Sequence, residues 1–328
     1  MSAPVSIMAD AALPRSAAPA ILAGRGGVFG TLSDWVWRHP RMFLFLMLTP
    51  PVLWLGIIYL GSLFALLLQS FFSIDEFSGL INREFTLKTY GELFRQQNID
   101  IFVRTILMAA LATIASAIIA FPIAYYAARY AKGKWKAAFY LGVMLPLWSS
   151  YLVKVYAWKL ILAKEGILNW IFAKLHLTWL LEAWLSLPIV GGNSLSVSYT
   201  GTFLVFVYVW MPFMILPMQA ALERVPANLI EASADLGAAP RQTFRNVILP
   251  LAMPGVIAGS IFTFSLTMGD YIIPQIVGTS RLFIGQAVYA HQGTAGNIPL
   301  AAAFTVVPIV VMGFYLWFAK RQGAFDAL

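Results

Sequence analysis

Residues Glu223–Pro250 read ERVPANLIEASADLGAAPRQTFRNVILP and form the one long polar run in the second half of the chain. Hydrophobic segments long enough to cross a bilayer lie on both sides of it. Pro226 fits the first turn of a short helix, where its missing N–H costs nothing. Gly237 fits the left-handed residue that ends such a helix, and Pro240 can start a second helix that stops at Pro250. The stretch therefore predicts a helix–Gly–helix loop between two membrane spans.

The first helix of this loop has two different faces. Asn228, Glu231 and Asp235 share one stripe, and Leu229, Ala232 and Leu236 share another. A short helix with a carboxylate face and an apolar face fits against a partner surface. Two other interpretations are open. A helix-turn-helix for DNA also has a Gly turn between two helices, and an amphipathic surface loop would place Arg241 and Arg245 on lipid phosphates.

The spacing within this loop resembles the EAA loop of the permease subunits of bacterial ABC importers. The family pattern is Glu-Ala-Ala, three residues, Gly, nine residues, Ile, any residue and Leu-Pro. It falls on Glu231, Ala232, Ser233, Gly237, Val247, Leu249 and Pro250, with Ser233 in place of the second Ala and Val247 in place of Ile. In the family, this loop carries the coupling helix that sits in a groove of the cytoplasmic ATPase. The resemblance implies that these residues, together with Asp235, couple the chain to such an ATPase.

The composition of the chain is that of a membrane protein. It is 60% hydrophobic and 11% charged, whereas about 25% of the residues of a soluble domain are charged. The net charge of +8 does not indicate nucleic-acid binding, because the Lys and Arg residues gather at the ends of apolar segments. The absence of Cys excludes disulfides, Cys-ligated zinc and thiol catalysis. The three His residues make no metal spacing, and no phosphate-binding loop occurs, so we expect no ATP hydrolysis by this chain.

Six apolar segments are long enough to cross a bilayer, which predicts an all-α integral membrane protein. They are residues 42–70, 101–128, 137–162, 199–221, 251–273 and 297–319. Pro50 and Pro51 predict a kink in the first segment. Gly255 and Gly259 form a GxxxG pattern in the fifth, which indicates either close helix packing or backbone flexibility. Together with the loop, the resemblance implies the six-helix fold of type I ABC importer permeases, with a cytoplasmic coupling helix.

Basic residues predict the orientation of these spans. Arg129–Lys136 contains four basic residues and no acid, and Lys320–Arg321 follows the sixth span. Such clusters mark the cytoplasmic side. We therefore expect a multi-pass protein of the bacterial inner membrane with both termini in the cytoplasm. Its parts would be a mostly disordered tail at residues 1–41, a permease domain at 42–320 and a short tail at 321–328.

Three segments are then expected on the outer side. Residues 71–98 are polar and mixed in charge, with a short helix near Leu87–Arg95. Residues 163–198 carry three tryptophans, at 170, 179 and 184, and are expected to lie partly at the membrane interface, where Trp is favoured. Residues 274–296 form the third segment.

A second motif, MGDYIIPQIVG at residues 268–278, follows the fifth span. It resembles the Gly-Asp-(Tyr/Phe)…Pro…Gly segment of spermidine/putrescine-type permeases. The resemblance implies a polyamine or related organic ion as substrate, and Asp270, Tyr271 and Pro274 as candidate residues of the translocation path. An acid at the end of a span indicates a role. The alternative is that Asp270 caps a helix or pairs with Arg281.

Two lysines lie in the outer half of the third span. Lys154 and Lys159 either extend to the membrane interface or face the translocation path. The second arrangement would oppose a polycationic substrate.

Taken together, these patterns predict the permease subunit of an ATP-driven ABC importer, which is a transport subunit and not an enzyme. The partners implied are a cytoplasmic ABC ATPase dimer, a second permease subunit that we expect to be a homologue, an external or periplasmic binding protein, and the lipid bilayer. The chain itself needs no cofactor, since ATP and Mg²⁺ would be bound by the ATPase. The alternatives are a stand-alone secondary transporter or channel, which usually places ionisable groups within the membrane, and a membrane-embedded enzyme. No cluster of His, Asp and Glu within the predicted spans supports an enzyme.

Overall fold

The fold was obtained as a computed structural model. It describes residues 40–75, 77–188, 190 and 192–321. Most of the predicted N-terminal tail (residues 1–41) and most of the predicted C-terminal tail (residues 321–328) fall outside these residues. The chain divides into two compact units, residues 1–65 and 66–328.

The first unit contains one long apolar helix. It is made of α2 (Pro40–Leu53), a π-helical stretch (Trp54–Leu60) and the start of α3 (Gly61–Gln69). Residues 41–69 are long and apolar enough to cross a membrane, in agreement with the predicted first span. Pro50 and Pro51 lack the N–H groups that an α-helix needs at these positions. The wider π stretch begins three residues after them, where the helix departs from regular α geometry.

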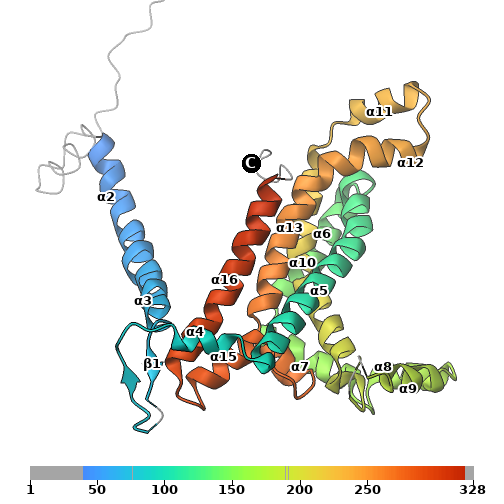
Figure 1. The fold of residues 1–328 in the computed structure, drawn as a ribbon. Helices are drawn as coiled ribbons and strands as arrows, with labels where there is room; N and C mark the ends of the chain where they lie inside the picture. Colours follow the sequence, from blue (N-terminus) through green and yellow to red (C-terminus); the bar gives the residue numbers. More distant parts are fainter. Residues whose placement is uncertain (1–39, 76, 189, 191, 322–328) are drawn as a thin grey trace, which may run out of the picture. The chain divides into compact units, whose positions relative to one another are not determined.

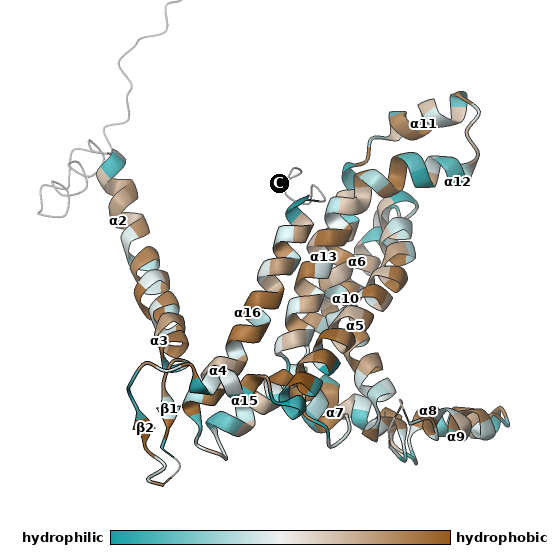
Figure 2. Ribbon diagram, viewed as in Figure 1, coloured by the Kyte–Doolittle hydropathy of each residue, from teal (hydrophilic) through white to brown (hydrophobic). Residues whose placement is uncertain are grey.

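The second unit is built around four long helices that lie side by side (Figure 1). They are α5 (Gln96–Arg129), α10 (Tyr199–Arg224), α13 (Leu249–Gly269) and α16 (Ile298–Arg321). They correspond to the predicted second, fourth, fifth and sixth spans, and each is long and apolar enough to cross a membrane. Figure 2 shows their predominantly hydrophobic colouring. The centre of the packing is α10, which contacts both α13 and α5 along its length.

Small residues allow this close packing. Gly255 and Gly259 of α13 face α10 so closely that an added Cβ would lie 2.4 Å from Cβ of Ala221 and 2.8 Å from Sδ of Met214, respectively. Of the two interpretations of the GxxxG pattern, close packing is therefore confirmed. Side-chain packing of this kind is the main attraction between helices in lipid.

The predicted third span, residues 137–162, is broken and not straight. Its halves are α6 (Gly133–Trp148) and α7 (Tyr151–Leu162), and the chain bends by 95° between α6 and the segment 151–174. Since the helix stops, the carbonyl of Pro146 has lost its α-helical partner. Ser149 Oγ and Lys154 Nζ donate to that carbonyl at 2.9 and 2.7 Å. These two bonds satisfy a polar group that would be costly to leave unpaired in the membrane.

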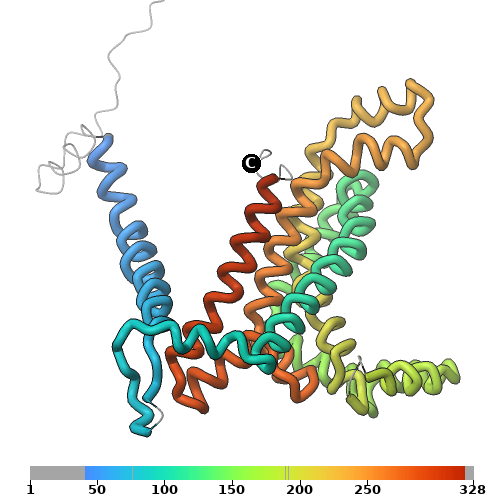
Figure 3. Tube along the Cα trace, viewed as in Figure 1, coloured from blue at the N-terminus to red at the C-terminus, as the bar shows by residue number. Residues whose placement is uncertain are grey.

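Short elements gather at one end of the bundle of the second unit, as the trace in Figure 3 shows. They are β1 (Ser73–Ile74), β2 (Ile81–Asn82), α4 (Lys88–Leu93), α7, α8 (Ile167–Lys174), α9 (Thr178–Leu185), a 3-10 turn (Leu195–Val197), α14 (Ile272–Ile276) and α15 (Ile284–Gln292). The strands pair antiparallel, with Ser73 opposite Asn82. The prediction of a short helix near Leu87–Arg95 is confirmed by α4. The loop elements α11 (Ala227–Asp235) and α12 (Pro240–Thr243) lie at the other end.

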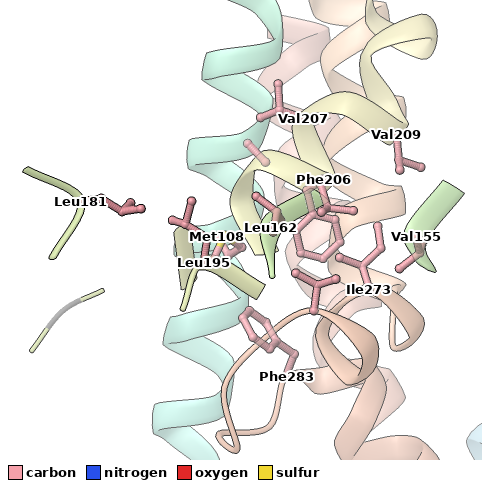
Figure 4. Packing of buried hydrophobic residues seen from close by; sticks show 13 residues of the cluster. Met108, Val155, Leu162, Leu181, Leu195, Phe206, Val207, Val209, Ile273 and Phe283 are labelled. Atoms are coloured by element: carbon pink, nitrogen blue, oxygen red, sulfur yellow. The ribbon is translucent and has the colours of Figure 1, made fainter. Parts of the chain in front are cut away.

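The largest buried cluster of side chains lies near the end that carries α7 and α14 (Figure 4). Phe206 of α10 is fully buried there, among Leu162, Ile273 and Phe283. These residues come from four separate segments, so the cluster holds the broken third span and the segment after α13 against α10. It thereby fixes the position of Asp270, which precedes α14.

Candidate functional site

The loop between α10 and α13 forms the predicted helix–Gly–helix. α11 begins after Pro226, at Ala227, and ends before Gly237, whose φ of +78° is left-handed. The N–H of Gly237 donates to the carbonyl of Ala234 at 2.8 Å, and that of Ala238 to Ser233 at 3.1 Å. This pair of bonds is the Schellman arrangement. The prediction that Gly237 ends the helix with a left-handed residue is confirmed.

The second helix of the loop begins at Pro240 as predicted, but the prediction that it stops at Pro250 is wrong. The helix continues through α12 and a π-helical stretch (Phe244–Ile248) into α13. The N–H of Leu249 reaches back five residues to the carbonyl of Phe244. Pro250 therefore occupies the first turn of a renewed α-helix, where its missing N–H is tolerated. Residues 240–269 form one run of 30 helical residues.

A bond between two hydroxyl groups joins the arms of the loop. Ser233 Oγ on α11 lies 2.9 Å from Oγ1 of Thr243, which is buried at the end of α12. The side chain of Gln242 accepts from the N–H of Ala239 at 2.8 Å and so caps the start of α12. The sequence contained a signal for the first contact, because Ser233 is the position at which the chain departs from the family's Ala.

α11 presents most of its surface to solvent. Glu231, Ala232 and Asp235 are exposed, in part as the predicted carboxylate stripe. Leu229 is 44% exposed and Leu236 is 88% exposed. An exposed apolar stripe beside exposed carboxylates is typical of a surface that a partner covers.

The remaining positions of the motif belong to the helix that carries the loop. Val247 and Leu249 are half-buried, and Ile248 between them is buried. Pro250 is exposed. The motif thus combines an outward part on α11 with an inward part that packs against the spans.

Aromatic and aliphatic side chains connect the loop to the spans. Phe244 packs edge-on against Phe121 of α5, with ring centroids 5.4 Å apart, and against Tyr125 at 6.5 Å. Ile248 is part of a buried cluster with residues of α5 and α10, and Ile230 of α11 packs against the same cluster. Since packed interiors transmit displacement, a movement of the loop would be passed to α5 and α10.

Polar contacts fix the point where α10 enters the loop. Arg129 at the end of α5 donates through Nη2 to the carbonyl of Val225 at 2.7 Å. Glu223 pairs with Lys136 of α6 at 2.9 Å and accepts from the hydroxyl of Tyr140 at 2.9 Å. The sequence alone indicates only a role in topology for the basic residues of 129–136, because their partners lie more than 80 positions away along the chain.

Asp270, the second candidate, lies between α13 and α14. Its Oδ1 accepts from the N–H groups of Ile272 and Ile273 at 2.7 and 3.0 Å, and its Oδ2 accepts from the hydroxyl of Tyr151. Asp270 therefore caps α14 and binds Tyr151, and Arg281 is not among these partners. The carboxylate joins the start of α7 to the end of α13.

The surroundings of Asp270 form an open pocket of 370 Å³. Its lining contains three aromatic rings besides the carboxylate, from Tyr151, Trp210 and Tyr271. The rings of Tyr151 and Trp210 stack with centroids 5.9 Å apart. Of the other candidate path residues, Pro274 is buried. Aromatic faces beside a carboxylate are the groups that attract an organic cation.

The lysines of the third span do not line this pocket. Lys154 donates to the carbonyl of Pro146, as described above, and its role is in the break of the span. Lys159 is exposed. Lys154 thus follows neither of its two predicted arrangements, at the membrane interface or in the translocation path, because its ammonium group binds within the chain.

Comparison with known proteins gives the family. The family of binding-protein-dependent transport system inner membrane components matches residues 120–323. The chain belongs to this family. It is 58% identical over 299 residues to the inner membrane ABC transporter permease protein YdcU of Escherichia coli K12, which covers 91% of this chain and 96% of YdcU. It is 28% identical over 258 residues to the spermidine/putrescine permease PotB of the same strain, covering 77% of this chain and 88% of PotB.

A solved structure shows the same fold. A permease chain of the bacterial ABC transporter involved in import of the acidic polysaccharide alginate matches with a TM-score of 0.63 and 16% identity, covering 89% of this chain and 99% of that one. The predicted type I permease fold is thereby confirmed, and the chain is an ABC importer permease, a non-enzymatic membrane subunit. A stand-alone secondary transporter, channel or membrane enzyme is set aside by family membership.

Proposed function

We propose that this permease forms half of a translocation path that is driven by a cytoplasmic ATPase through α11. The observation that carries the proposal is the loop itself. α11 projects from the end of the bundle opposite α7 and α14 (Figure 1), with Glu231, Asp235 and Leu236 exposed. The loop is also braced internally at Ser233 and Gly237, so it would move as a unit. ATP and Mg²⁺ would be bound by an ATPase dimer, and this chain would contribute no cofactor site.

The continuous helix from Pro240 to Gly269 would transmit a movement of α11 directly to the other end of the bundle. At about 1.5 Å per residue, 30 residues span about 45 Å. One end carries the coupling loop, and the other end leads directly into Asp270 and its pocket. A displacement of α11 would therefore tilt or shift α13 and change the opening of the pocket. Transport requires that two states, one with the pocket open and one with it closed, are stabilised in turn. This chain would carry out no covalent chemistry.

Two further partners complete the proposal. The pocket at Asp270 is open, which is consistent with a second permease subunit, expected to be a homologue, that closes the path from the other side. A periplasmic binding protein would deliver the substrate to the end of the bundle that carries α7 and α14. The solved alginate transporter, whose permease has this fold, was crystallised in complex with a periplasmic protein.

The proposed substrate is a polyamine or a related organic cation. Support comes from the PotB relatives and from the carboxylate and aromatic rings that line the pocket. Lys154 does not oppose this proposal, since its ammonium group is held by the Pro146 carbonyl.

The experiment that tests the coupling proposal is the substitution Glu231→Ala. Glu231 is exposed, so the permease should insert normally. We expect ATPase binding to weaken by about tenfold, equivalent to about 1.4 kcal/mol, with a matching loss of substrate-stimulated ATP hydrolysis in reconstituted vesicles. Glu182→Ala, an exposed Glu at the other end of the bundle, is the matched control. Wild-type ATPase binding and hydrolysis in the Glu231 variant would show that α11 is not the coupling element.

A further inference from the structure

The segment that follows the broken third span leaves the bundle sideways. α6 packs against α10, whereas α7 and α8 continue at 95° to α6 and α9 packs back on α8 (Figure 1). We call α8 and α9 together, residues 167–185, the α8–α9 arm. If α6, the first half of the predicted third span, follows the membrane normal, the segment 151–174 at 95° to it runs along the membrane plane.

The α8–α9 arm has one face packed on the bundle. Leu168 and Phe172 of α8, and Leu181 and Leu185 of α9, pack in the buried cluster that surrounds Phe206. In each helix these residues are four positions apart, which places them on one stripe. This stripe accounts for the attachment of the arm to the bundle.

The side chains outside these stripes are largely apolar as well, and several of them are exposed. Trp170 of α8 is 61% exposed, and Ile167 and Ile171 lie on the same stripe at spacings of three and four residues. On α9, Trp179 is 64% exposed and Leu180 is 46% exposed. The hydropathy colouring of both helices is accordingly hydrophobic (Figure 2). A short helix that is apolar on two faces is not adapted to water.

We propose that the α8–α9 arm lies in the interfacial layer of the bilayer, with these exposed faces in contact with lipid. Trp is favoured in this layer because its ring is apolar and its N–H needs a polar partner. Lys174 lies with Nζ 5.8 Å from the centroid of the Trp170 ring. From there its long side chain can place the ammonium among lipid phosphates while the stem stays on the apolar surface.

A second permease subunit is the other candidate for covering this surface. The lysine favours lipid, because Lys is depleted from the centres of protein–protein interfaces. The direction of the arm favours lipid too, since its exposed faces continue the apolar surface of a membrane protein along the membrane plane. The arm follows the end of α7, so it would then hold that helix, which begins at Tyr151, at a fixed depth. This inference rests on membership of a membrane permease family and does not depend on the coupling role of α11.

The test uses the absence of Cys from the chain. Single cysteines at Ile171 and Leu180, one on each helix, are labelled with a nitroxide in the assembled transporter, in vesicles of phosphatidylethanolamine and phosphatidylglycerol. Collision rates with oxygen, which concentrates in lipid, and with a water-soluble nickel chelate are then compared. We expect high oxygen and low nickel accessibility, at a depth of about 5–10 Å below the phosphates. Lys134→Cys, on the exposed start of α6, is the aqueous reference.

Two results would overturn the proposal. High nickel accessibility at both positions would place the arm in water, and low accessibility to both reagents would place it against a protein subunit. Because the two labels are on separate helices, the second variant still tests the position of the arm if the first variant fails to fold. ATPase binding by the labelled transporter is expected to be unchanged, which separates this outcome from a failure of the coupling proposal.

Discussion

Arg129 holds the end of α10 through a hydrogen bond of 2.7 Å from its Nη2 to the carbonyl oxygen of Val225, 96 residues later in the sequence. Val225 follows the last residue of α10 and precedes the loop that carries α11 and α12. A guanidinium at this position satisfies a carbonyl that the helix leaves unpaired and complements the negative end of the helix dipole. The ends of α5 and α10 are therefore connected where the loop begins.

The first prediction concerns this contact. Arg129→Met keeps the apolar stem of the side chain and removes the donor, and the carbonyl of the buried Val225 loses its partner. We expect a loss of about 1–3 kcal/mol in the free energy of unfolding, with faster hydrogen exchange in α11. Thermal unfolding of the purified permease and exchange mass spectrometry measure both effects. Arg241→Met, an exposed site on α12, is the control. If the two variants unfold alike, the contact is not a structural element of the loop.

The second prediction concerns the hydroxyl pair of Ser233 and Thr243. Ser233→Ala restores the family's residue, and Thr243→Val keeps the shape of a buried side chain. Each single change should destabilise the loop, and the double variant should lose less than the sum of the two. A double-mutant cycle on unfolding should give a coupling energy of about 0.5–1.5 kcal/mol. Strict additivity would mean that the two hydroxyl groups do not interact.

The third prediction concerns the backbone at Gly237. Its φ is +78°, and an added Cβ would meet no atom within 4 Å. The cost of Gly237→Ala is therefore conformational only, on the order of 1–2 kcal/mol. Gly142→Ala is the matched control, because that glycine also has open space around it but lies within α6. A helical Gly→Ala change should be stabilising by roughly 0.5–1 kcal/mol. Equal effects at the two sites would contradict the left-handed assignment.

The fourth prediction separates charge from capping at Asp270. Asp270→Asn keeps the oxygen that caps α14 and removes the charge, whereas Tyr151→Phe keeps the charge and removes one of its hydrogen bonds. If the carboxylate attracts a cationic substrate, only Asp270→Asn should raise the half-saturation concentration for uptake, by about tenfold. Thermal unfolding of both variants controls for folding. Unchanged uptake in Asp270→Asn would leave this residue with a structural role alone.

The fifth prediction concerns the orientation of the chain in the membrane. Lys134 and Ser78 are exposed and lie at opposite ends of the second unit, and each neighbours a glycine of positive φ that is unsuited to substitution. A cysteine at Lys134 should react with a membrane-impermeant thiol reagent only from the cytoplasm, and one at Ser78 only from outside. The reverse pattern would place α11 outside the cell and exclude coupling to a cytoplasmic ATPase.

Local sequence rules predicted the loop and most of the spans correctly. Gly237 marks a left-handed conformation that few other residues adopt, and Pro240 has the fixed φ of a helix and lacks an N–H that the first turn does not need. Their positions alone therefore locate the end of one helix and the start of the next. The spans follow from hydropathy, and the observed helices begin and end within a few residues of the predicted bounds, the third span excepted.

The predictions from sequence were wrong where a distant side chain, or a stretch of π-helix, provides the hydrogen bonds of the backbone. Hydropathy does not reveal the break at Ser149, because it depends on a lysine side chain that binds the Pro146 carbonyl. Pro250 did not end its helix, because the π-helical stretch before it changes which N–H groups are needed. The contacts of Arg129 and Glu223 escaped detection because they join residues far apart in sequence.

The π-helical stretch at Phe244–Ile248 makes the direction in which the loop points depend on the number of residues in the motif. Each residue of an α-helix turns the chain by about 100°. An extra residue held in a wider turn therefore rotates everything before it about the axis of α13. The direction in which α11 faces thus depends on the number of residues between Gly237 and Pro250, and not only on their identity. Insertion or deletion of one residue there would redirect Glu231 around the helix axis, while the packing of α13 beyond Pro250 would keep its register.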